Sequence, residues 1–89
     1  MKAIVTVIGK DTVGIIAFVC AILSENGVNV LDISQTVMQD YLTMIMMTDL
    51  TSSTRPFAEL ASLLKDEGEK RGLVIRIQRE DIFEAMHRI

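Results

Sequence analysis

The chain has 89 residues, of which 49% are hydrophobic, and its formal net charge is −3. This length predicts one domain spanning residues 1–89, and so apolar a composition excludes a disordered chain. The basic residues are scattered, which argues against nucleic acid and anionic membranes as partners, because both require clustered positive charge.

The sequence shows neither a membrane span nor a signal peptide, which favours a cytoplasmic protein. No apolar run approaches the roughly 18 residues of a membrane span. Lys2 precedes an apolar stretch, but polar residues 9–11 interrupt it and no small-residue cleavage site follows, which argues against a signal peptide. The one cysteine, Cys20, cannot form a disulfide within the chain, so a reducing compartment fits best.

The chain opens with a predicted central strand over residues 2–8, which is rich in β-branched residues and apolar on both faces. A helix is predicted over residues 13–26, capped by Asp11 or Thr12 and ended by Gly27. Its apolar residues at helical spacing form the expected core stripe: Ile15, Val19, Ile22 and Leu23.

Residues 28–50 predict a hairpin. The alternation over residues 28–39 is imperfect, which indicates an edge strand with a possible bulge. A turn at residues 39–41 leads into a second central strand over residues 42–50, which again carries apolar side chains on both faces.

A second helix is expected after the hairpin, with Ser53 or Thr54 as its cap, Pro56 in its first turn and Gly72 as its stop. Its buried stripe is Phe57, Leu60, Ala61 and Leu64. The clean alternation of residues 73–80 predicts an edge strand with one wet face. Residues 81–89 then predict a short C-terminal helix.

The resulting order is βαββαβ plus a terminal helical turn, which is an α+β, ferredoxin-like plan. Right-handed crossovers place both helices on one face of an antiparallel sheet ordered 4-1-3-2. The core then spans about residues 2–80 and the tail about residues 81–89. Since the central strands are apolar on both faces, the second face requires a cover. We expect a homodimer, with a tetramer possible and the tail helping; the alternative is a monomer covered by its tail alone.

The turn after the first strand, GKDTVG, spaces Gly9 and Gly14 like a phosphate-binding loop. That loop continues with Lys and then Ser or Thr, whereas Ile15 and Ile16 stand here, which argues against nucleotide hydrolysis.

The same turn leaves the N–H groups of Val13, Gly14 and Ile15 free at a helix start, where a carboxylate is favoured. Asn29 and Asp32 form a second polar group that could help to recognise an ammonium and a carboxylate. The alternative is structural: an ordinary capped helix, a turn asparagine and an exposed strand aspartate.

No constellation in the sequence indicates catalysis. His87 is the only histidine, so no metal site is expected, and Cys20 has no evident acid–base partner. We therefore expect neither catalytic residues nor a metal or cofactor.

The segment VTVIGKDTVGIIAFVCAILSENGVNVLDISQ resembles the first half of an ACT domain, with a G-x-D-x-x-G-I turn and an x-G-x-N-I-x-D-I stretch, in which Val30 replaces the usual Ile. With its tail IFEAMHRI, the whole chain resembles the stand-alone ACT proteins of the UPF0237 family, which are related to the ACT halves of a glycine-cleavage-system regulator.

The resemblance implies a homodimer that binds an amino acid or similar effector between the first turn and the second strand, at a subunit interface. The residues carried over are Asp11, Thr12, Val13, Gly14, Ile15, Asn29, Asp32 and, through its backbone, Leu31. The expected function is that of a non-enzymatic regulatory module. The alternative is a ligand-free subunit that docks on an enzyme or transcriptional regulator.

Overall fold

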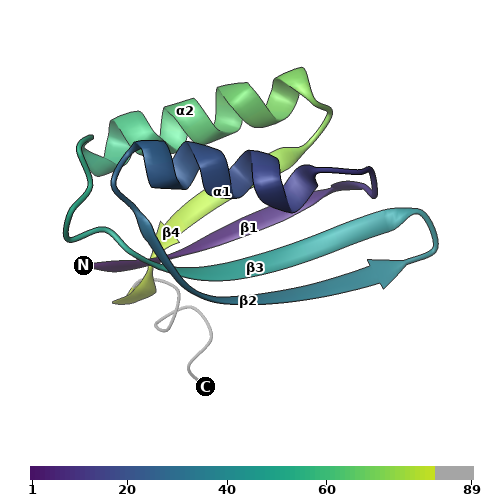
Figure 1. The fold of residues 1–89 in the computed structure, drawn as a ribbon, viewed down its shortest axis with the longest axis horizontal. Helices are drawn as coiled ribbons and strands as arrows, with labels where there is room; N and C mark the ends of the chain where they lie inside the picture. Colours follow the sequence, from purple (N-terminus) through teal and green to yellow (C-terminus); the bar gives the residue numbers. More distant parts are fainter. Residues whose placement is uncertain (82–89) are drawn as a thin grey trace.

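Six elements follow one another in the order βαββαβ in the computed structural model, which describes residues 1–81 (Figure 1). They are β1 (Lys2–Lys10), α1 (Ile15–Glu25), β2 (Asn29–Met38), β3 (Tyr41–Asp49), α2 (Phe57–Lys70) and β4 (Val74–Arg79). The strands form one four-stranded sheet ordered β2-β3-β1-β4, which is the expected order read from the other edge. All neighbouring strands are antiparallel, and both helices cover the same face (Figure 1). The predicted ferredoxin-like fold is confirmed.

The core lies between the sheet and the two helices. Its largest fully buried side chains are Val5, Val7, Val19, Leu23, Met44, Met46, Thr48, Leu60 and Leu64. The hydroxyl of Thr48, a polar member of this set, donates a hydrogen bond of 2.8 Å to the carbonyl oxygen of Ala3. Ile22, which was expected in the core stripe of α1, is half-buried and packs against the margin of the core.

Both helices end as predicted, each at a glycine in the left-handed conformation. Gly27 follows α1 with φ of 75°, and Gly72 follows α2 with φ of 71°. After α1, the N–H of Val28 donates to the carbonyl of Leu23, and after α2 the N–H of Leu73 donates to that of Gly68. These paired motifs satisfy carbonyls that a helix end otherwise leaves without partners.

The predicted helix caps are wrong. No side chain caps either helix in the described part of the chain. Gly14, with φ of 90°, occupies the cap position of α1, so the helix begins at Ile15 and neither the Asp11 nor the Thr12 side chain caps it. Before α2, Pro56 takes the cap position. The Ser53 hydroxyl donates instead to the carbonyl of Arg55 at 2.8 Å, and the Thr54 hydroxyl donates to the carbonyl of Asn26 at 3.3 Å.

The strand β2 is an edge strand with a bulge, as predicted. Val30 pairs with Thr48 and Asp32 with Met47, which leaves Leu31 as an extra residue between them. After the bulge, Gln35 and Val37 pair with Met44 and Leu42. Those β3 residues are buried under the helices, so Gln35 and Val37 also lie on the helix side of the sheet.

The sheet face away from the helices is called the open face below. Of the segment 81–89, for which a C-terminal helix is predicted, only Asp81 is among the described residues, so that helix and His87 lie outside them and the helix stays a prediction. Among residues 1–81, no helix is both long and apolar enough to cross a membrane.

Candidate functional site

A concavity of about 270 Å³ lies where the turn after β1 meets β2 and the start of α1. Its lining residues are Asp11, Thr12, Gly14, Ile15, Ile16, Ala17, Gln35, Val37 and Leu42. The turn supplies polar groups, the first turn of α1 supplies backbone and small or apolar side chains, and the hairpin supplies the far wall. The concavity therefore combines an apolar floor with a polar rim.

The start of α1 presents uncapped backbone donors to this concavity. The first helical hydrogen bond runs from the N–H of Phe18 to the carbonyl of Gly14 at 2.9 Å. The N–H groups of Ile15, Ile16 and Ala17 precede it, so they have no partner within the helix. Because those three residues also line the concavity, the positive end of the helix faces it. A carboxylate is the chemical group that such a terminus favours.

The rim of the concavity is held by a backbone hydrogen bond between two turns. The N–H of Asp11 donates to the carbonyl of Asp40, in the β2–β3 turn, at 2.7 Å. This bond fixes Asp11 beside the end of the hairpin that carries Gln35 and Val37. A carboxylate, an amide and uncapped N–H groups are therefore held around one small hollow, a combination suited to a zwitterion.

The structure brings together Asp11, Thr12, Gly14 and Ile15 of the expected site residues. Val13 is 97% exposed and does not line the concavity. Asn29 and Leu31 lie near the beginning of β2, whereas Val37 lies near its end, about 26 Å from Asn29 and about 20 Å from Leu31 for an extended strand.

Asp32 lies on the opposite side of the sheet. It pairs with Met47 and lines a hollow of about 170 Å³ on the open face with Ile4, Ser34, Ile45 and Met47. Its carboxylate accepts a hydrogen bond of 2.9 Å from the N–H of Ile33. Within one chain, the structure therefore does not place Asp32 with the Gly14 turn.

Five lining residues were not among the expected site residues: Ile16, Ala17, Gln35, Val37 and Leu42. Ile16 and Ala17 follow Gly14 directly, so their backbone could have been included once the helix start was placed at Ile15. Gln35 and Val37 could have been found only from the hairpin register after the bulge.

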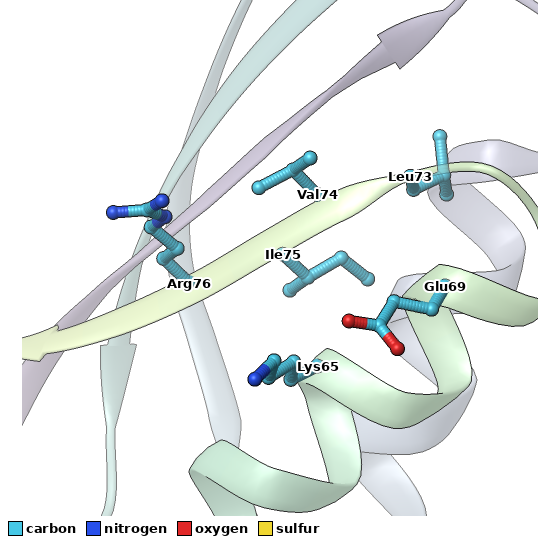
Figure 2. Close-up of a pocket in the computed structure, with 6 residues that line it drawn as sticks. All are labelled: Lys65, Glu69, Leu73, Val74, Ile75 and Arg76. Atoms are coloured by element: carbon cyan, nitrogen blue, oxygen red, sulfur yellow. The ribbon is translucent and has the colours of Figure 1, made fainter.

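A larger hollow, of about 440 Å³, lies between α2 and the outer edge of β4 (Figure 2). Lys65 and Glu69 border it from α2, and Ile75 fills the space between helix and strand (Figure 2). It contains none of the expected site residues. Within residues 1–81, no group of three or more His, Cys, Asp or Glu side chains is arranged to hold a metal ion.

The fold and this concavity define a class: a ferredoxin-like α+β module with a hollow between its first turn and its second strand. The family model of the ACT domain matches residues 2–78, and the chain belongs to the ACT domain family.

Full-length relatives agree with this assignment. A UPF0237 protein of Clostridium acetobutylicum is 56% identical over 89 residues, covering 100% of both chains. The solved structure of an ACT domain protein from Streptococcus pneumoniae is 42% identical, covers 97% of each chain and superposes with a TM-score of 0.83. A putative glycine cleavage system transcriptional repressor, at 19% identity and a TM-score of 0.73, shares the fold over 86% of this chain and 44% of its own.

Proposed function

We propose that the chain is a non-enzymatic, cytoplasmic regulatory module that binds an amino acid or similar small zwitterion in the concavity at Gly14. The observation that carries the proposal is the uncapped start of α1, whose backbone donors face a hollow already bordered by Asp11 and Gln35. The helix start would hold the carboxylate, since the N–H groups there lack partners within the helix. Asp11 would take the ammonium, and Ile16, Val37 and Leu42 would contact the effector's side chain.

A second copy of the chain completes this site in the proposal. β2 is an edge strand, so its outer side is open to pairing with another chain. Antiparallel pairing of two β2 strands about a two-fold axis would set the beginning of one beside the end of the other. Leu31 of one copy would then approach Val37 and the concavity of its partner, whereas Asn29 pairs with Asp49 and lies on the open face of the sheet. The strands remain in one continuous sheet, so Asp32 stays on the open face and is not needed for binding.

Binding between two copies of the chain would regulate their assembly without a chemical reaction. An effector that binds only the paired form stabilises it by mass action, by about 2.7 kcal/mol at a hundred times its Kd. The relatives named as ACT domain proteins and the family match support a regulatory role of this kind.

Isothermal calorimetry of the full chain with a panel of free amino acids tests the proposal. At least one should give saturable heat. Ala17 is exposed, lines the concavity and lies in a helix, so Ala17→Leu should fill the hollow and weaken binding at least about tenfold, which corresponds to 1.4 kcal/mol. The matched control is Ala21→Leu, an exposed position one turn further along α1 that lies outside the concavity.

Asp32→Ala should leave the affinity unchanged, whereas Asp11→Asn should weaken it. Absence of heat from every amino acid, or equal affinities for Ala17→Leu and the wild-type chain, would contradict the proposal. Such a result would favour the ligand-free docking subunit instead.

A further inference from the structure

The hollow of about 440 Å³ between α2 and β4 runs along the outer edge of the sheet. From the strand side it is lined by four consecutive residues, 73–76. Successive side chains of a strand point to opposite faces, and Figure 2 shows Ile75 on the α2 side with Val74 and Arg76 on the other. A hollow that touches all of them lies on neither face. It lies beside the edge of β4, where a further strand of the sheet would lie.

The backbone of β4 turns unpaired groups toward this edge. In an antiparallel ladder, alternate residues direct their N–H and C=O groups to the same neighbour. Residues of β1 at odd positions bond to β3, as the bond from Asp11 to Asp40 at the end of that register shows. Those at even positions therefore bond to β4, where the register pairs them with even-numbered residues. The N–H and C=O groups of Ile75 and Ile77 thus point outward, and within residues 1–81 β4 pairs with β1 alone.

The walls of the hollow differ in character between the two sides of the strand. On the α2 side, Leu73 and Ile75 are each only 3% exposed and form an apolar wall, bordered by Lys65 and Glu69 (Figure 2). On the open face, Arg76 is exposed beside the edge. Within residues 1–81, the Arg76 guanidinium forms no ion pair. An occupant of the edge therefore meets apolar surface on one side and a positive charge on the other.

The strand β4 lacks two features that commonly keep an edge strand from pairing. It contains no proline, and its register with β1 continues without a bulge from Val74 to Arg79. Its short length, six residues, limits the segment that can be added rather than preventing the addition.

We propose that this edge docks an extended segment of another protein, which adds to the sheet as a fifth strand beside β4. The added strand runs antiparallel to β4, as every pair of neighbours in the sheet does. Its backbone bonds to the outward groups of Ile75 and Ile77, which supply affinity, and its alternate side chains supply specificity.

The register of such a strand fixes the chemistry of the partner. Residues opposite Ile75 and Ile77 place their side chains on the α2 side, against the apolar wall, so these residues are apolar. The residue between them lies opposite Arg76 on the open face, so it is acidic, because oppositely charged cross-strand pairs stabilise a sheet. The partner segment therefore alternates apolar and acidic residues.

This docking edge is separate from the effector concavity. β2 and β4 are the two ends of the strand order, and no residue that lines the concavity also lines the hollow at β4. A segment bound at β4 leaves the concavity and the outer edge of β2 accessible. The inference does not rest on the proposed effector function, so either can fail without the other.

A synthetic peptide, acetyl-Thr-Val-Glu-Val-Glu-Val-Thr-amide, tests the proposal with the full chain. Isothermal calorimetry should show saturable binding of one peptide per chain. The same peptide with N-methylated valines keeps every side chain but lacks the N–H groups that an antiparallel strand turns toward β4. It should bind at least about tenfold more weakly, because each lost hydrogen bond reduces affinity.

Charge exchange tests the contact with Arg76. Arg76→Glu should weaken binding of the peptide by about fivefold or more, since it turns an attractive cross-strand pair into a repulsive one. The variant should bind the peptide with Lys in place of both Glu residues more tightly than the wild-type chain does. Lys10→Glu is the matched control: it makes the same charge change at an exposed position outside the hollow and should leave the affinity unchanged.

Amide hydrogen exchange locates the bound peptide. At saturation the N–H groups of Ile75 and Ile77 should exchange more slowly, while the outward N–H groups of β2 should be unaffected. The proposal is overturned if the peptide does not bind, if the N-methylated peptide binds equally well, or if the protection falls on β2 instead of β4. Affinity that is unchanged in Arg76→Glu would likewise overturn the assigned partner chemistry.

Discussion

The carboxylate of Asp49, at the end of β3, accepts two hydrogen bonds from one residue. The Thr51 hydroxyl donates at 2.6 Å and the Thr51 N–H at 2.9 Å, both to Oδ1. These bonds favour the charged form and hold the pKa of Asp49 below its ordinary value of 3.8, with the hydroxyl contributing most. The turn that leads from the sheet toward α2 is thus fixed in part by one ionised side chain.

Thr51→Val should raise the pKa of Asp49 toward 3.8, since it removes the larger of the two causes and keeps the backbone bond. The measurement is a carboxyl carbon NMR titration of Asp49 in both proteins. Thr51→Ser is the control, because it retains the hydroxyl and should leave the pKa low. An identical titration in the wild type and Thr51→Val would show that the hydroxyl does not act on this carboxylate.

The same bonds set the sign of a pH effect on stability. The pKa of Asp49 is lower in the folded state than in the unfolded state, so its contribution is present above about 3.8 and is lost as pH falls through the folded value. The stability difference between the wild type and Thr51→Val should therefore shrink in acid below that range.

The contact between α2 and β4 depends on a glycine inside a helix. Gly68 is buried on the face of α2 that packs against β4. A Cβ added there would lie 2.8 Å from Cγ1 of Ile75 and 3.1 Å from the carbonyl oxygen of Leu73. The glycine thus lets the helix approach the strand more closely than any other residue would allow.

Gly68→Ala should destabilise the fold by about 1–3 kcal/mol, the usual cost of overpacking a core, although alanine is the better helix former by about 1 kcal/mol. Urea unfolding measures the change. Ile75→Val removes the Cδ1 atom, which would lie 2.9 Å from the new alanine Cβ, so the double variant should lose less than the sum of the single changes. Additive losses would show that Cδ1 of Ile75 does not limit the approach, and a stabilised Gly68→Ala would show that the helix and strand have room for a Cβ there.

The order of the elements, the order of the strands and the ends of the helices could be predicted from the sequence. The spacing of apolar residues and the positions of glycines determine these features from the local sequence alone. The starts of the helices could not be predicted in the same way, since a left-handed Gly14 and an extended Pro56 occupy the cap positions in place of the polar residues expected there.

The candidate site was predicted only in part, for a reason that lies in β2. A bulge at Leu31 moves every later residue to the other face, so it carries Asp32 to the open face and turns Gln35 and Val37 toward the concavity. A bulge was expected, but the alternation of apolar and polar residues does not show at which residue it lies. That position determines which side chains of β2 face the helices and which face the open side.

At the scale of the whole molecule, the outer edge of β2 is the surface on which the proposed effector site depends. Most of the strand is exposed, including the apolar residues Leu31, Ile33, Val37 and Met38. A long, apolar edge strand with unpaired backbone groups pairs readily with another chain. β4 is the other edge of the sheet, and it is shorter, with only six residues.

Amide hydrogen exchange of the full chain distinguishes these two edges. If copies pair through β2, its outward N–H groups, on alternate residues, exchange slowly at high chain concentration and quickly on dilution, because assembly follows mass action. The outward N–H groups of β4 serve as the internal control and should exchange quickly throughout. A saturating effector, at a hundred times its Kd, should slow exchange along β2 by up to about a hundredfold, since it stabilises the paired form by about 2.7 kcal/mol. Exchange along β2 that is fast at every concentration would mean that no second copy borders the concavity, and the effector would then have to be held by the Gly14 turn and its own hairpin alone.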